Sequence, residues 1–108
     1  YKPSSKNYKL WKKYYSGGTG LLSIVIKSKS KSSVVKFVNS LELFGIGYSW
    51  GGFESLAILQ DLKKKTEYTK GRNFHRFNKD EHVVRLHIGL EDSKELIVDL
   101  KNSLRHIK

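Results

Sequence analysis

An arginine stands alone inside an apolar segment near the C-terminal end of the chain. Residues 83–88 read VVRLHI, and Arg85 is the one formal charge among them. An unpaired charge at a buried position is costly, so an arginine there needs an anionic partner. That partner is either structural, with Glu54 or Asp61 as candidates, or the carboxylate of a ligand, which a guanidinium binds through two parallel hydrogen bonds. The pattern alone leaves both interpretations open.

A glycine-rich stretch is the second candidate for chemistry. Residues 45–52 read GIGYSWGG, with four glycines around Tyr48, Ser49 and Trp50. Glycine lets the backbone bend and approach another group closely. The segment is either a turn whose tryptophan fills the core, or the lip of a pocket with a hydroxyl, an aromatic wall and unpaired backbone N–H groups.

The other reactive side chains form no recognisable constellation. The four histidines do not combine with each other or with nearby carboxylates at ligand spacing, and cysteine is absent. We therefore expect no metal site, and ordinary surface or sheet histidines at His75, His82, His87 and His106. The glycines of residues 17–20 lack the Lys-Ser/Thr ending of a phosphate-binding loop, so no nucleotide site is predicted.

Hydrophobic patterning predicts the strands that would position Arg85. Residues 21–27 (LLSIVIK) and 83–88 are short and rich in β-branched residues, and residues 54–59 can form a further short strand. Residues 60–81 are polar and rich in lysine, which predicts an excursion from the sheet. Within it, residues 66–69 could pair briefly.

Helical spacing predicts two helices and a short third one. Residues 33–44 form an amphipathic pattern that Ser33 could cap and Gly45 could end. A C-terminal helix is expected over about residues 92–106, opening with Asp92 in a capping box. Its predicted apolar face consists of Leu96, Ile97, Leu100 and Leu104. A short N-terminal helix could present Leu10, Trp11 and Tyr14 on one face.

These elements predict an α+β fold, a two-layer sandwich with helices on one face of a small, mainly antiparallel sheet. In the strand around Arg85, alternation would put Val84, Leu86 and Ile88 on one face and Val83, Arg85 and His87 on the other. Two helices can cover only one of these faces. The uncovered face with Arg85 indicates a missing partner layer.

Length and composition limit the classes of protein. The chain has 108 residues, which is the size of one domain, and it has no apolar run long enough for a membrane span. It lacks cysteine, which suits a reducing compartment, and we expect a cytoplasmic protein. It also lacks methionine, including at position 1, so we expect a fragment, a processed product or a trimmed chain.

The net charge of +11 raises the question of a polyanion partner. The basic residues are 17 lysines and 4 arginines, and they are scattered along the chain. Arginine is the better residue for bidentate contacts with phosphates and bases. A solvated basic surface is therefore favoured, with no specific nucleic-acid site and no membrane contact.

Three stretches together resemble one family. They are residues 44–56 (FGIGYSWGGFESL), 84–92 (VRLHIGLED) and 95–100 (ELIVDL), and the glycine-rich residues 15–23 add a weaker match. They resemble the C-terminal domain of the pyridoxal-phosphate (PLP) enzymes of Cys/Met metabolism, which have fold type I. Within that family the Ser-Trp-Gly-Gly and Arg-Leu-His-Ile-Gly motifs are most similar to the cystathionine β-lyases of transsulfuration and methionine biosynthesis.

The resemblance implies roles for four residues. Arg85 would hold the α-carboxylate of an amino-acid substrate such as cystathionine, Ser49 would help at that carboxylate, and Tyr48 and Trp50 would line the substrate entrance. It also implies that PLP is bound by an upstream large domain, because the Schiff-base lysine and the phosphate-binding motifs of the family do not occur here. Residues 1–108 would be the single C-terminal, substrate-side domain of a homotetrameric carbon–sulfur lyase and inactive alone.

Two alternatives stay open at this point. The full protein could be a cystathionine γ-synthase or γ-lyase, although Trp50 argues against it because those enzymes more often have leucine there. The chain could instead be a free-standing basic module from a split gene that binds polyanions. The lysine-rich residues 60–81 depart from the family, which leaves the substrate specificity open.

Overall fold

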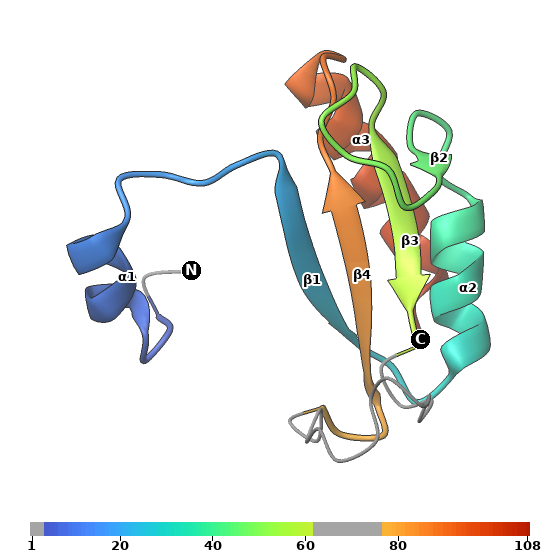
Figure 1. Cartoon of the computed structure of the whole chain (residues 1–108). Coiled ribbons are helices and arrows are strands. Elements are labelled where there is room, and N and C mark those ends of the chain that lie inside the picture. Colours follow the sequence, from blue (N-terminus) through green and yellow to red (C-terminus); the bar gives the residue numbers. More distant parts are fainter. Residues whose placement is uncertain (1–3, 62–76) are drawn as a thin grey trace, which may run out of the picture.

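Four strands form one sheet, and the strands and helices together make the predicted α+β class. The computed structural model describes residues 4–61 and 77–108. Helices α2 and α3 cover one face of the sheet, so the predicted two-layer α+β fold is confirmed (Figure 1). The elements in chain order are α1 (Tyr8–Tyr14), β1 (Leu21–Lys27), α2 (Lys31–Asn39), β2 (Gly45–Ile46), β3 (Leu56–Gln60), β4 (Glu81–His87), α3 (Ser93–Ser103) and the 3-10 turn η2 (Leu104–His106).

The strand that carries Arg85, β4, lies inside the sheet. The strand order is β1-β4-β3-β2, and β4 runs antiparallel to both β1 and β3. Arg85 lies in register between Ser23 of β1 and Ile58 of β3. The two residues of β2, within the glycine-rich stretch, were not predicted as a strand and pair in parallel with β3. A central strand is held on both edges, so the position of Arg85 is fixed by two ladders of backbone hydrogen bonds.

Helix α2 begins and ends earlier than its periodicity predicts. Its N-cap is Ser30, whose hydroxyl accepts a hydrogen bond from the Ser33 backbone N–H at 3.4 Å, so the predicted cap at Ser33 is wrong. The helix ends at Asn39, not at residue 44. Phe44 is nevertheless buried, because the loop after α2 returns it to the core. Phe44 is spaced from the buried residues of α2 as if it belonged to the same helix, although it lies in the loop after that helix.

The core lies between the sheet and helices α2 and α3. The predicted apolar face of α3 is only partly right, since Leu96 is buried and Leu100 partly buried while Ile97 and Leu104 are exposed. The N-cap at Asp92 is confirmed, because its carboxylate accepts from the Lys94 N–H at 2.7 Å. The buried core consists of Ile26, Val34, Phe37, Val38, Phe44, Ala57, Val84, Leu86 and Leu96.

Helix α3 buries one carboxylate, that of Asp99, as well as apolar side chains. Asp99 accepts hydrogen bonds from the backbone N–H groups of Glu42, at 3.0 Å, and Leu43, at 2.9 Å. Both donors belong to the loop that follows α2, where no helix or strand partner is available to them. Asp99 therefore joins α3 to this loop through hydrogen bonds to a charged acceptor.

Helix α1 stands away from the sheet (Figure 1). The short N-terminal helix is present as predicted, and the rings of Tyr8 and Trp11 stack with centroids 5.8 Å apart. None of its residues is buried, so the apolar face predicted for Leu10 and Tyr14 has no covering element in the described part of the chain. No helix within residues 4–61 and 77–108 is long and apolar enough to cross a membrane.

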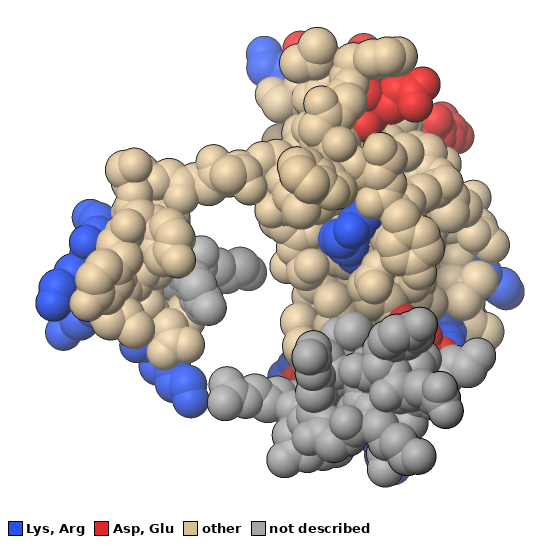
Figure 2. Space-filling view, in the orientation of Figure 1, with Lys and Arg blue, Asp and Glu red and all other residues tan. Residues whose placement is uncertain are grey.

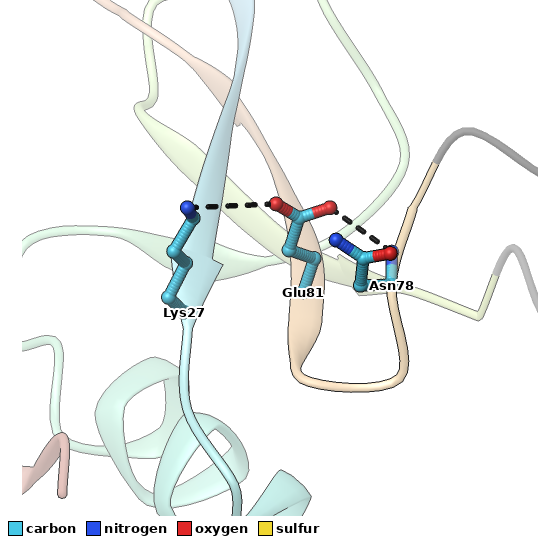
Figure 3. Close-up of polar contacts among 3 residues, drawn as sticks. All are labelled: Lys27, Asn78 and Glu81. Atoms are coloured by element: carbon cyan, nitrogen blue, oxygen red, sulfur yellow. Dashed lines mark hydrogen bonds and ion pairs between the residues drawn. The ribbon is translucent and has the colours of Figure 1, made fainter.

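One end of the sheet is tied by polar contacts where the chain enters β4 (Figure 3). Lys27 Nζ lies 3.8 Å from Glu81 Oε1, and the Asn78 N–H donates to Glu81 Oε2 at 3.0 Å. Lys27 and Glu81 are register partners, and opposite charges across a ladder favour that register. The excursion predicted between β3 and β4, with its possible pairing at residues 66–69, falls mainly on residues 62–76, outside the described part of the chain.

The two faces of β4 differ as the alternation predicts. Val84 and Leu86 pack in the core with the helices, while Val83, Arg85 and His87 lie on the opposite face. Val84 shares the core with residues of α2 and α3, and Figure 1 shows both helices on the same side of the sheet, which confirms that part of the prediction. Among the described elements, no helix covers the opposite face, which we call the open face of the sheet. Val83 and His87 on this face are nevertheless buried, and Arg85 is partly exposed, so the uncovered face expected from the sequence is found only in part.

The core predicts a large and local effect of truncating Phe37. Its side chain is fully buried, so Phe37→Ala should lower the free energy of unfolding by about 3–5 kcal/mol through lost burial and a cavity. Val35→Ala, on the exposed side of the same helix, is the matched control and should cost less than about 1 kcal/mol. Urea denaturation followed by circular dichroism measures both. Equal losses would show that α2 does not pack on the sheet through Phe37.

Candidate functional site

Arg85 is an isolated charge on the open face of the sheet. Figure 2 shows a basic patch over β4 with uncharged atoms directly around it, and Arg85 is the only lysine or arginine of that strand. The residue is partly exposed. Its backbone is rigid, because β4 is paired on both edges. On the open face Arg85 therefore lies apart from the Lys27–Glu81 ion pair, which the register places four residue pairs beyond it along β1 and β4.

The glycine-rich loop meets this cation through its backbone. Arg85 Nη2 donates to the carbonyl oxygen of Tyr48, and the carbonyl oxygen of Ser49 lies at 3.5 Å from the same nitrogen. The guanidinium carbon also lies 5.5 Å from the centre of the Tyr48 ring, within the range of a cation–π contact. The structure thus brings together three of the four predicted site residues, Arg85, Tyr48 and Ser49.

Neither carboxylate suggested as a structural partner reaches Arg85. Asp61 forms its ion pair with Lys31, with Oδ2 and Nζ 3.1 Å apart, and the Glu54 side chain is exposed. In residues 4–61 and 77–108, no carboxylate lies within 4 Å of the guanidinium. Carbonyl oxygens carry only partial negative charge, so they orient the guanidinium without neutralising it. A guanidinium has five N–H donors, and the loop carbonyls leave donors for an anion.

The fourth predicted residue, Trp50, lies at the edge of the site. Its side chain is 66% exposed, so the alternative in which this tryptophan fills the core is wrong. Tyr48 and Phe53 are also largely exposed. The loop therefore presents three aromatic side chains to the surroundings of Arg85, without a core of its own to hold it. Something else has to fix its position.

Hydrogen bonds to the segment after β4 hold one end of this loop. Glu91 accepts two bonds from Ser55, from its N–H to Oε1 and from its hydroxyl to Oε2, each 2.7 Å long. The Ser55 hydroxyl in turn accepts from the Gly89 N–H at 2.8 Å. Both Ser55 bonds favour the ionised carboxylate, so the pKa of Glu91 lies below its ordinary value. The larger cause is the Ser55 backbone N–H, and the Ser55 hydroxyl comes second.

Two further contacts fasten the loop just before Ser55. The Leu90 N–H donates to the Phe53 carbonyl at 2.8 Å, and His87 Nε2 lies 3.1 Å from the Gly52 carbonyl oxygen. Gly89 has no room for a side chain, because an added Cβ would overlap the Phe53 carbonyl oxygen. Within the loop, Gly51 has a φ of +79°, a conformation that favours glycine.

Glu91, Ser55 and His87 were not assigned a role from the sequence. The motif around Arg85 contained Glu91, but a glutamate after a strand is usually a surface residue and gives no periodic signal. Ser55 reads as the start of a short strand, and its burial follows only from the fold. The available signal was Gly89, because a glycine directly after an apolar strand indicates a close approach of backbone.

The described residues do not fit covalent attachment of a carbonyl cofactor such as PLP. A Schiff-base lysine is activated by desolvation or by a neighbouring cation in a pocket. Every lysine in the described part of the chain is exposed. The same residues hold no group of three metal-ligating side chains. The site around Arg85 can bind and orient an anion.

Comparisons with known proteins agree with the motifs. A family model described as Cys/Met metabolism PLP-dependent enzyme matches residues 1–105. The chain is 40% identical over 104 residues to a cystathionine β-lyase from Bordetella avium, covering 94% of this chain and 24% of that protein. It is 37% identical over 99 residues to cystathionine β-lyase MetC of Escherichia coli, covering 91% and 24%.

A solved structure shares the fold. Cystathionine γ-synthase from Xanthomonas oryzae pv. oryzae, determined in complex with cystathionine, matches with a TM-score of 0.69 and 22% identity over 97% of this chain and 27% of that chain. At this identity the likeness concerns the fold alone. The chain spans about a quarter of the length of the curated relatives it matches.

The lowered pKa of Glu91 predicts how its contribution to stability depends on pH. A group whose folded-state pKa lies below the unfolded value stabilises the fold above the unfolded value, which is ordinarily 4.5, and this contribution is lost as pH falls through the folded value. Glu91→Gln should therefore melt at a lower temperature than the unsubstituted chain at pH 7. The gap should shrink as pH falls below 4.5.

Thermal melting of both chains between pH 3 and 7 measures this gap. Glu54→Gln, which removes the same charge from an exposed neighbour of Ser55, should show little gap at any pH. A Glu91→Gln gap that stays constant across the range would show that the ionised carboxylate is not what Ser55 recognises.

Proposed function

Since the chain belongs to the Cys/Met metabolism PLP-dependent enzyme family, we propose that it is the substrate-side, C-terminal domain of a cystathionine β-lyase. The domain contributes a clamp for the α-carboxylate of the amino-acid substrate. Cystathionine is the proposed substrate, because the relatives above are cystathionine β-lyases at 37–40% identity over most of this chain.

One observation carries the proposal. The guanidinium of Arg85 sits on the open face of the sheet with its charge neutralised by no carboxylate of the described residues. A substrate α-carboxylate is an anion whose planar geometry matches the guanidinium fork. Its binding would provide the counter-charge that the fold leaves out, and the loop carbonyls of Tyr48 and Ser49 would keep the guanidinium aimed.

The neighbouring residues have supporting parts in this proposal. The Ser49 hydroxyl would donate to the bound carboxylate, since its backbone already lies next to the guanidinium. The exposed rings of Tyr48 and Trp50 would form the wall of the substrate entrance. Closing that wall would exclude water and strengthen the Arg85–carboxylate attraction, because charges interact more strongly in a medium of low polarity.

Bond cleavage is assigned to residues outside this chain. PLP would supply the electron sink for the reaction, and we propose that the large domain binds it. Residues 1–108 would hold and orient the substrate and would neither bind PLP covalently nor cleave cystathionine alone. A cystathionine γ-synthase or γ-lyase would need the same carboxylate clamp, so Arg85 alone does not separate these activities from the β-lyase.

The role of Arg85 is tested by Arg85→Lys in a holoenzyme. In a chimera, residues 1–108 replace the matching segment of E. coli cystathionine β-lyase. Lysine keeps the charge but loses the fork, so kcat/KM for cystathionine should fall by about ten- to a hundredfold, equivalent to about 1.5–3 kcal/mol. If the clamp binds ground and transition states equally, the loss should appear mainly in KM.

The matched control is Arg105→Lys, the same exchange at an exposed position in η2. Its kinetics should equal those of the unsubstituted chimera. The melting temperature of Arg85→Lys should also change little, because no described carboxylate depends on this arginine. Unchanged kinetics with a much lower melting temperature would show that Arg85 is a structural residue and would overturn the proposed clamp.

The basic charge of the chain gives a second, independent test. If the charge is a solvated surface, the chain should bind duplex DNA or RNA only weakly and without sequence preference, and binding should vanish at moderate salt. Fluorescence anisotropy with labelled oligonucleotides over a salt series measures this. Tight binding at physiological salt with a clear sequence preference would favour the polyanion-binding alternative.

A further inference from the structure

Glu91 connects the end of the Arg85 strand to the start of β3 through a single residue, Ser55. Ser55 is completely buried, and its N–H and hydroxyl groups both donate to the Glu91 carboxylate at 2.7 Å. Ser55 directly follows the loop whose Tyr48 and Ser49 carbonyls meet the Arg85 guanidinium. A paired contact of this kind fixes orientation as well as position, because two bonds to one carboxylate prevent rotation.

We propose that Glu91 is a positioning residue for the anion site: by locking Ser55 it holds the Tyr48–Ser49 carbonyls against Arg85, so that the guanidinium presents its remaining donors to a carboxylate. This inference rests on the proposed function, because it assumes that the anion is the carboxylate of an amino-acid substrate. In this role Glu91 does not touch the ligand and acts on the site through the loop.

The loop offers few other ways to keep this geometry. Its aromatic side chains at Tyr48, Trp50 and Phe53 are exposed, so apolar packing does not hold it. Its described tethers to the sheet are the pairing of β2 with β3 just before the loop, the Arg85 contacts of Tyr48 and Ser49, and the bonds of Gly52, Phe53 and Ser55 at the far end. The Gly52 and Phe53 tethers lie within three residues of Ser55. Only the Ser55 tether ends on a carboxylate, and bonds to an ionised acceptor are about twice as strong as neutral ones.

The arrangement couples the two ends of the site. Releasing Ser55 should loosen the loop, because the Gly52 and Phe53 tethers then hold its far end alone. Gly51 and Gly52 resist backbone motion least, so residues 48–50 could shift against Arg85. The Arg85 side chain would then lose its carbonyl partners and sample more rotamers. A carboxylate would have to order that side chain on binding, which weakens affinity. Glu91 therefore raises the affinity for the ligand by limiting the rotamers that the Arg85 side chain can adopt.

The test is an NMR titration of the 108-residue chain labelled with ¹⁵N in arginine and backbone, using L-cystathionine as the probe. Glu91→Gln is compared with Glu54→Gln, which removes the same charge one residue before Ser55 from an exposed side chain. All proteins are measured at pH 7 and at a temperature where each is folded. The readouts are the dissociation constant, the Arg85 side-chain NH shift, and amide exchange in residues 48–53.

The expected result is a dissociation constant about tenfold higher for Glu91→Gln than for the unsubstituted chain. The Arg85 NH shift should lose the contribution of the Tyr48 ring, and amides of residues 48–53 should exchange faster. Glu54→Gln should match the unsubstituted chain in all three readouts. A purely stabilising role of Glu91 would lower the melting temperature and leave these readouts of the folded protein unchanged.

Failure of the inference is distinguishable from failure of the proposed function. If the unsubstituted chain binds cystathionine at Arg85 and Glu91→Gln binds equally well, the positioning role is overturned and the clamp stands. If the unsubstituted chain does not bind, the clamp fails in this chain, and the Arg85 shift and loop exchange without ligand still decide the positioning role. If Glu91→Gln does not fold, Ser55→Ala takes its place, because it removes the hydroxyl bond to Glu91, along with the bond from the Gly89 N–H, and keeps the bond from the Ser55 N–H to Glu91.

Discussion

The structure depends on the alternation of side chains along one central strand. β4 is paired on both edges, and its even-numbered residues Val84 and Leu86 are buried against α2 and α3. Slipping the register by one residue would put Arg85 into that core and expose the apolar set, which is strongly unfavourable. Burial of one face therefore fixes the position of the arginine on the other. The location of the anion site follows from the packing of the core behind it.

The loop over Arg85 is held by polar contacts where apolar contacts are missing. Its ring-bearing residues are exposed, and its ordered end relies on Glu91, His87 and the backbone of Leu90. Hydrogen bonds have preferred distances and directions, so they can orient carbonyl oxygens that exposed apolar side chains leave unconstrained. The same contacts leave the aromatic side chains available to line a substrate entrance.

The sequence predicted the features that arise from local periodicity. The bounds of β1 are as predicted, the helices cover the Val84 face, and Asp92 caps α3, because strand alternation and capping are encoded within a few residues. The motifs also indicated Arg85, Tyr48 and Ser49, which are in contact in the structure. These are residues about 37 positions apart, and their proximity depends on the sheet register.

The errors have a common physical origin in contacts between distant segments. Helix α2 ends at Asn39 because the chain turns there and returns Phe44 to the core, which periodicity cannot distinguish from a longer helix. Asp99 was not among the residues predicted to face the core from α3, since its partners lie in a loop more than fifty residues away. The Ser55–Glu91 pair escaped notice for the same reason.

The most direct measurement of the central claim is a crystal structure of the chimeric holoenzyme with cystathionine bound. Our account predicts both oxygens of the α-carboxylate within hydrogen-bonding distance of the Arg85 guanidinium, with the loop still anchored through Ser55 and Glu91. A substrate carboxylate bound to another residue, with Arg85 paired to a carboxylate of the rest of the protein, would contradict the account.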